Sequence, residues 1–199
     1  MKKIFIRTKG DQNCGWGNVV RQLIIAKHLI TNKNKVFFFV ETDTNLSVFI
    51  SKSGINLIKL SKSISIKQEK KILEKFGKPN ISIIETLQPS LKLQNLYSKL
   101  SDKLIIYDDL LTGKYISDIL ISCQNTKVKK KKILNKNLKF YSGYEYFPIY
   151  YQNKKKIKKE VEKLNIIFGG SSYELLYNKI ASALKKFPNL KVKMVISRR

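Results

Sequence analysis

The chain has 199 residues, 43% of them hydrophobic, which excludes an intrinsically disordered chain and suffices for one α/β domain and part of another. The formal net charge is +26, and all but four of the 40 basic residues are lysine. Nucleic-acid-binding proteins favour clustered arginine, so we attribute the excess to A/T-rich codon usage and predict no specific nucleic-acid partner, although a polyanion remains an alternative.

Apolar runs alternate with helical spacings through the first 150 residues. The strands read as unbroken apolar runs, which is typical of a parallel sheet covered on both faces. We therefore predict an α/β, Rossmann-like fold. In chain order the elements are the strand Ile4–Arg7, helix Val19–Leu29, strand Lys35–Val40, helix Leu46–Lys52, strand Ile55–Leu60, helix Ser65–Phe76, strand Ile81–Thr86, helix Leu91–Leu100, and strands Leu104–Tyr107 and Ile119–Ser122.

Residues 126–137 and 154–159 are rich in lysine and predict solvated segments. The strand–helix–strand pattern then restarts. Its predicted elements are the strand Leu164–Phe168, a turn at Gly169–Gly170, the helix Tyr173–Phe187 and the strand Val192–Ile196. A single βαβ unit cannot bury both faces of its sheet. We therefore expect an N-terminal Rossmann-like domain at 1–150 and the incomplete beginning of a C-terminal nucleotide-binding domain at 151–199.

Two glycines, Gly15 and Gly17, lie between the first predicted strand and helix. Glycine lets the backbone approach a ligand closely, and a helix N-terminus attracts anions. The segment is not a dinucleotide fingerprint, because the third glycine of that pattern would fall at Val20. The alternative is a tight turn in which Asn18 caps the helix.

Two further places could carry chemistry. Gly169, Gly170 and Ser171 follow a later strand and suit a pyrophosphate, or Ser171 simply caps the next helix. Asp108 and Asp109 end another strand, at the edge where open α/β sheets bind ligands. That pair could bind a metal or a sugar, or could cap the following turn.

The remaining signals concern compartment and cofactors. Cys14 and Cys123 are far apart, with neither disulfide nor zinc spacing, so we expect a reducing cytoplasm. We expect no cofactor. The N-terminal sequence MKKIFIRTKGD is too polar for a signal peptide, and no apolar run approaches the ~20 residues of a transmembrane helix. We therefore expect no membrane insertion. His28, the only histidine, is interpreted as a packing or surface residue.

Four segments, taken in order, resemble the UDP-sugar hydrolases of pseudaminic acid biosynthesis and the related spore-coat polysaccharide proteins. They are GWGNVVRQLIIAKHL, LIIYDDL, FYSGYEYFPIYYQ and NIIFGGSSYELLYNKIASAL. The resemblance implies a GT-B-like pair of domains acting on a UDP-sugar, a 2,4-diacetamido-2,4,6-trideoxyhexose, without a metal. It places Gly15, Gly17, Arg21, Asp108 and Asp109 around the sugar and Gly169, Gly170 and Ser171 around the pyrophosphate.

The sequence departs from that family at two positions. The family's catalytic histidine falls on Asn18, which cannot accept a proton near neutral pH, and loss of a general base costs ~10²–10⁴-fold in rate. The family's aspartate after the second glycine turn falls on Ser172. We therefore expect an impaired hydrolase. The alternatives are a GT-B glycosyltransferase of surface polysaccharide synthesis or a noncatalytic polyanion-binding protein, and the oligomeric state is left open.

Overall fold

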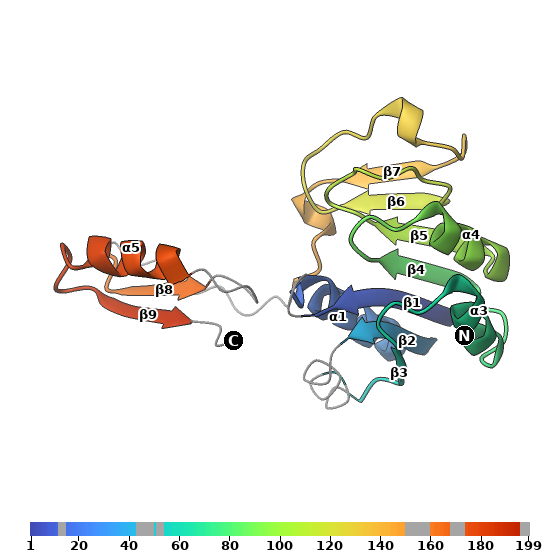
Figure 1. Cartoon of the computed structure of the whole chain (residues 1–199), viewed down its shortest axis with the longest axis horizontal. Coiled ribbons are helices and arrows are strands. Elements are labelled where there is room, and N and C mark those ends of the chain that lie inside the picture. Colours follow the sequence, from blue (N-terminus) through green and yellow to red (C-terminus); the bar gives the residue numbers. More distant parts are fainter. Residues whose placement is uncertain (12–14, 43–49, 51–53, 150–159, 168–173, 196–199) are drawn as a thin grey trace. The chain divides into compact units, whose positions relative to one another are not determined.

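The computed structural model describes residues 1–11, 15–42, 50, 54–149, 160–167 and 174–195 (Figure 1). The chain divides into two compact units, Met1–Tyr150 and Tyr151–Arg199. Apart from Ile50, the predicted helix Leu46–Lys52 lies outside the described residues.

The first unit is built on one parallel sheet of seven strands, which confirms the predicted α/β, Rossmann-like class. Its spatial order is β3-β2-β1-β4-β5-β6-β7. The chain therefore builds outward from β1 on one side and then returns to the other side of β1, which creates a topological switch point between β1 and β4. The strands are β1 (Lys3–Gly10), β2 (Lys35–Thr42), β3 (Leu57–Leu60), β4 (Ile81–Glu85), β5 (Lys103–Tyr107), β6 (Ile119–Ser122) and β7 (Lys139–Ser142).

Helices cover both faces of this sheet, because alternate residues of each strand point to opposite sides. The helix α1 (Gly17–Thr31) packs on the face that carries Ile4 and Ile6. The helices α3 (Ile66–Glu74) and α4 (Leu91–Leu100) pack on the face that carries Phe5. Both faces of the sheet are therefore covered, as the unbroken apolar strands predicted.

Local signals fix where two of these helices begin. Ser65 and Gln68 form a reciprocal capping box at the start of α3. The Ser90 hydroxyl accepts a hydrogen bond from the Leu93 amide at the start of α4. The helix therefore begins at Leu91, as the sequence predicts.

Strand β7 was not predicted. It includes the first residues of the segment FYSGYEYFPIYYQ. It pairs with β6, from Ile119 beside Lys139 to Ser122 beside Ser142. As an edge strand it is only half covered, so its sequence KFYS lacks the continuous apolar run of the central strands. Short 3₁₀ turns precede and follow it, at Lys130–Lys132 and Tyr144–Tyr146.

The second unit contains β8 (Lys163–Ile167), α5 (Glu174–Leu184) and β9 (Lys191–Val195). Strands β8 and β9 are parallel neighbours, with Lys163 beside Lys191. These are the strand, helix and strand that the sequence predicts. No helix among the described residues of either unit has the length and apolar character needed to span a bilayer.

A buried ion pair ties β1 to α3. The Arg7 side chain, 3% exposed, donates from Nε to Glu69 Oε1 at 2.9 Å and from Nη2 to Glu41 Oε2 at 2.9 Å. The Tyr97 hydroxyl of α4 also donates to Glu69 Oε1, at 2.7 Å. Glu69 therefore joins a strand and two helices through one carboxylate.

Replacing Glu69 with alanine should destabilise the first unit by about 3 kcal/mol, because a buried guanidinium loses a partner and the Tyr97 hydroxyl loses its acceptor. Urea unfolding followed by the fluorescence of Trp16, the only tryptophan, measures this unit. Glu74→Ala is the control, because Glu74 forms an exposed pair with Lys70 at 3.6 Å and should cost less than about 0.5 kcal/mol. Equal losses in the two variants would contradict the role of the buried pair.

Candidate functional site

The candidate site lies at the carboxyl ends of the strands in the first unit. Parallel strands bring their carboxyl ends to one edge, and ligands of open α/β sheets bind beyond that edge at a switch point. Here the glycine turn follows β1, Glu85 ends β4, Asp108 and Asp109 follow β5, and Cys123 follows β6. Residues from four strand ends therefore converge beside the start of α1.

The glycine turn leads directly into α1. Gly15 has a φ of +75°, and its amide donates to the Asp11 carbonyl at 2.8 Å. The N-cap of α1 is Trp16, which makes no side-chain cap hydrogen bond, and the first turn contains no acidic residue. Asn18 lies inside the helix, so the interpretation of Asn18 as the cap is wrong. The helix dipole at this end therefore favours an anion and meets no carboxylate from its own first turn.

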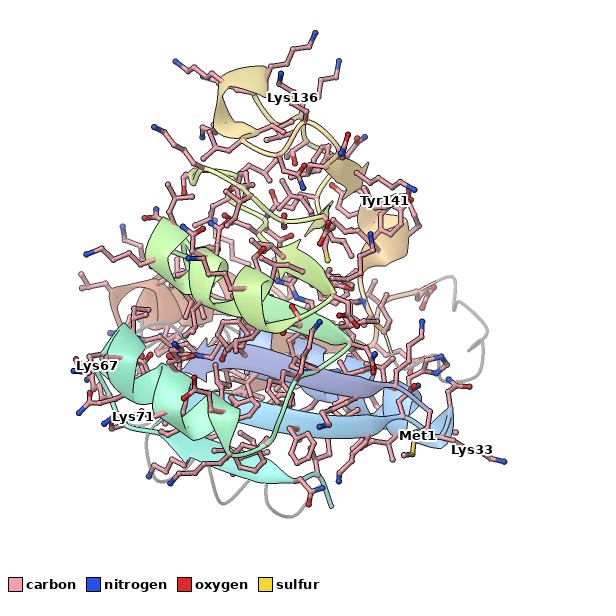
Figure 2. All side chains as sticks on the ribbon, turned by 90° about the vertical axis from the view of Figure 1, so that its right-hand side faces the viewer. Met1, Lys33, Lys67, Lys71, Lys136 and Tyr141 are labelled. Carbon is pink, nitrogen blue, oxygen red and sulfur yellow. The ribbon has the colours of Figure 1, made fainter. Side chains whose placement is uncertain are left out.

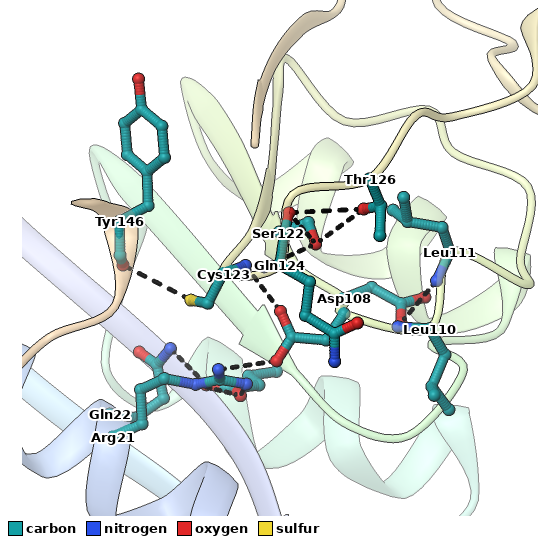
Figure 3. A network of polar contacts seen from close by, with 12 residues as sticks. Arg21, Gln22, Asp108, Leu110, Leu111, Ser122, Cys123, Gln124, Thr126 and Tyr146 are labelled. Atoms are coloured by element: carbon teal, nitrogen blue, oxygen red, sulfur yellow. Dashed lines mark hydrogen bonds and ion pairs between the residues drawn. The ribbon is translucent and has the colours of Figure 1, made fainter. Parts of the chain in front are cut away.

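Arg21 lies one turn into α1 and joins the strand ends. Its Nε donates to Glu85 Oε1 at 2.7 Å, and its Nη1 donates to Asp109 Oδ2 at 2.7 Å (Figure 3). Nη2 also contacts Glu85 Oε1, while Gln22 donates from Nε2 to Glu85 Oε2 at 2.7 Å. Arg21 is 8% exposed and Glu85 2%. The structure thus brings together Arg21 and Asp109, which are 88 residues apart.

The two adjacent aspartates have different roles. Asp108, 5% exposed, accepts hydrogen bonds from the amides of Leu110 and Leu111 and, at 2.8 Å, from the Tyr115 hydroxyl. Asp108 therefore caps the turn after β5, which is one of the two interpretations that the sequence left open. Asp109 faces Arg21 instead. Among the described residues, no group of three or more His, Cys, Asp and Glu side chains is arranged to hold a metal ion.

Asp109 and Arg21 extend the network to the segment after β7. Asp109 Oδ1 accepts from the Cys123 amide at 2.7 Å, and the Cys123 thiol donates to the Tyr146 carbonyl, with 3.4 Å between Sγ and O. Burial raises the pKa of Cys123 to about 11, so its thiol stays protonated as a donor. The Phe147 ring lies over the Arg21 guanidinium, 5.5 Å from its carbon to the ring centroid.

The loops at this edge also hold strained backbone. Gln88, after β4, has a φ of 52°, and Leu111, after β5, has a φ of 50°. Each such left-handed residue other than glycine costs roughly 1–2 kcal/mol. Strain of this kind persists where surrounding contacts impose it, and it concentrates at functional sites. These two loops and the charge network occupy the same edge of the sheet, whereas Lys33, with a φ of 61°, lies at the opposite edge.

Sequence reasoning found part of this site and missed Glu85, Gln22 and Cys123. Glu85 gave one signal, because it is a carboxylate at the end of a strand that is apolar apart from Ser82. The other predicted residues, Gly169, Gly170 and Ser171, lie outside the described residues, as do Ser172 and Cys14. His28 is exposed in the last turn of α1, at the opposite end of the helix from the site.

Comparison with known proteins supports the fold. No protein-family model and no curated protein matches the chain. The crystal structure of MurG from Acinetobacter baumannii is similar over 100% of this chain and 69% of its own, with a TM-score of 0.57 and 9% sequence identity. At this identity the likeness shows the fold alone, which is GT-B-like. The sequence resemblance to the hydrolases implied the same architecture, and the hydrolase family itself stays a prediction.

Glu85 should make the stability of the first unit depend on pH. Burial raises its pKa to about 7, from an ordinary value of 4.5, despite the hydrogen bonds from Arg21 and Gln22. The folded state therefore binds this proton more tightly than the unfolded state does. Protonation of Glu85 thus stabilises the fold at low pH, and that stabilisation is lost as pH rises through 7. Relative to Glu85→Gln, the wild-type unfolding free energy should fall by about 2–3 kcal/mol between roughly pH 5 and 8. A constant difference across that range in urea titrations would refute the shift.

The two glycines should respond in opposite ways to alanine. Gly15→Ala forces a side chain into the left-handed region and should cost about 1–2 kcal/mol. Gly17 begins α1, and a Cβ built there meets no atom within 4 Å. Gly17→Ala should therefore leave stability unchanged or raise it by up to about 1 kcal/mol. Urea unfolding of both variants tests this, and a destabilised Gly17→Ala would show that the turn is packed more tightly than described.

Proposed function

We propose that this chain is part of a GT-B glycosyltransferase that uses a UDP-sugar. The observation that carries the proposal is the whole-chain likeness to MurG, itself a GT-B glycosyltransferase. It is supported by the first unit, where a glycine turn and a helix start lie at the switch point of a parallel sheet. In this proposal the carboxyl edge of the sheet forms the wall that faces the sugar.

The residues of that wall divide into contact and positioning groups. Gly17 leaves open space at the start of α1, and the half-buried Asn18 offers an amide that both donates to and accepts from a sugar hydroxyl. Arg21 has its Nε, Nη1 and Nη2 bonded to Glu85 and Asp109, so we assign it the role of positioning α1. Asp108 and Asp109 act likewise, by fixing the loops after β5 and β6.

The second unit completes the proposal. Gly169, Gly170 and Ser171, between β8 and α5, are proposed to hold the UDP pyrophosphate, because glycine-rich turns before helices suit that group.

Hydrolysis of a UDP-sugar is the second candidate, and the four sequence segments favour it. Against it, Asn18 stands where the resemblance places the histidine, and the single histidine of the chain lies at the far end of α1. Asn18 can orient a hydroxyl or a water but cannot take its proton. Transfer to an acceptor hydroxyl is therefore the reaction we place first.

UDP release from UDP-sugars, measured on the full chain with and without N-acetylhexosamine acceptors, separates the two reactions. Transfer predicts release that requires an acceptor, and equal release without one would establish hydrolysis. Asn18→Ala should raise KM about three- to tenfold, the effect of one hydrogen bond. The control is Asn56→Ala, because Asn56 is exposed just before β3, at the opposite edge of the sheet.

Two substitutions sharpen this experiment. Gly17→Ala should lower kcat/KM while stability is kept, because its methyl group occupies space that the sugar would use. Asn18→His should leave acceptor-independent release unchanged if the chain is a transferase. A rise in that release would favour the hydrolase, and full activity in Gly17→Ala would remove the glycine turn from the site.

A further inference from the structure

A groove runs between α3 and α4, on the face of the sheet opposite α1. One part has a volume of about 710 Å³, and a second of about 220 Å³ continues it toward Gly77 and Pro79. The two parts share Glu74, Lys99 and Leu100, so the groove follows both helices. At 1.5 Å per residue, a helix the length of α4 covers roughly 15 Å, about ten residues of a partner helix.

The floor of the groove is apolar and the rim is basic. Ile66, Leu96 and Leu100 line the floor, and their buried sides join the core beneath. Lys70, Lys92 and Lys99 line the rim. Lys67 and Lys71 add charge beside it, and both project from α3 away from the sheet (Figure 2).

Few carboxylates offset these lysines. α4 has no acidic residue at all, and of the two in α3, Glu69 is turned inward to Arg7 and Tyr97. Glu74 lines the groove, where it pairs with Lys70, and Asp102 pairs with Lys78 in the second part. The positive rim is therefore a consequence of the fold, since the core takes an acidic side chain that the sequence places in the same helix.

We propose that this α3–α4 groove binds one amphipathic helix of a partner protein, with aliphatic side chains on one face and carboxylates beside them. Aliphatic anchors at positions i, i+3 or i+4 and i+7 would fill the apolar floor, as in other helix-in-groove complexes. The carboxylates would meet Lys92 and Lys99 at the rim, which sets the charge of the partner. None of the residues that line this groove belongs to the candidate site, so the proposal does not depend on the transferase reaction.

The test uses fluorescence anisotropy with a labelled peptide of about 14 residues, four helical turns, with leucine at helical spacing and glutamate elsewhere. A scrambled peptide of the same composition has the same charge but no apolar face. The full chain should bind the first peptide at least about tenfold more tightly than the second at physiological ionic strength. Equal affinities would show that charge alone attracts the peptide, and no binding would equally overturn the proposal.

Matched variants locate the binding. Asn95 is exposed on α4 and lines the groove, so Asn95→Trp should fill it and weaken binding about tenfold or more, whereas Ser98→Trp, on the same helix outside the groove, should not. The double variant Lys92→Glu and Lys99→Glu should act like Asn95→Trp, and Lys129→Glu with Lys131→Glu is its charge control. Equal effects of the two charge pairs would refute the groove. Phosphatidylglycerol vesicles that bind in place of the peptide, with the same loss in Asn95→Trp, would assign the surface to a membrane.

Discussion

The carboxyl edge of the first unit depends on neutralising one buried guanidinium. Arg21 is removed from water, so its charge requires carboxylates within hydrogen-bonding distance, and Glu85 and Asp109 supply them. Glu85 ends β4, and Asp109 lies in the loop after β5. Asp109 also accepts a hydrogen bond from the Cys123 amide, which ties this loop to the end of β6. The start of α1 is thereby held against three strand ends. This network therefore sets the geometry of any site on that edge.

The pattern of apolar residues was sufficient to predict most of the fold, because a two-sided parallel sheet requires strands that are apolar on both faces. The pattern was less exact about which side of a helix is buried. The two adjacent valines of α1 differ, since Val20 is 38% exposed and Val19 is fully buried. The stretch VVRQLII is apolar on several sides, so periodicity alone does not choose the face that meets the sheet. Strand β7 was missed because half-covered edge strands carry too few apolar residues to be recognised.

The candidate site was predictable where a single turn determines it and unpredictable where distant segments do. Gly15 and Gly17 follow from their place between a strand and a helix. The pairing of Arg21 with Glu85 joins residues 64 apart in sequence, and nothing local in either segment indicates the other. Asp108 and Asp109 show the same division, since the turn that Asp108 caps is local and the contacts of Asp109 are not. Residues of the second glycine turn stay predictions.

The high lysine content has a local consequence on the paired strands of the second unit. Within the described residues, β8 and β9 are parallel neighbours. Exposed lysines alternate along β9 at Lys191 and Lys193, and Lys163 of β8 is the register partner of Lys191. Like charges on directly opposite residues of neighbouring strands repel each other and weaken the pairing. Added salt shortens the reach of that repulsion, so the pairing of β8 with β9 should strengthen as the ionic strength rises.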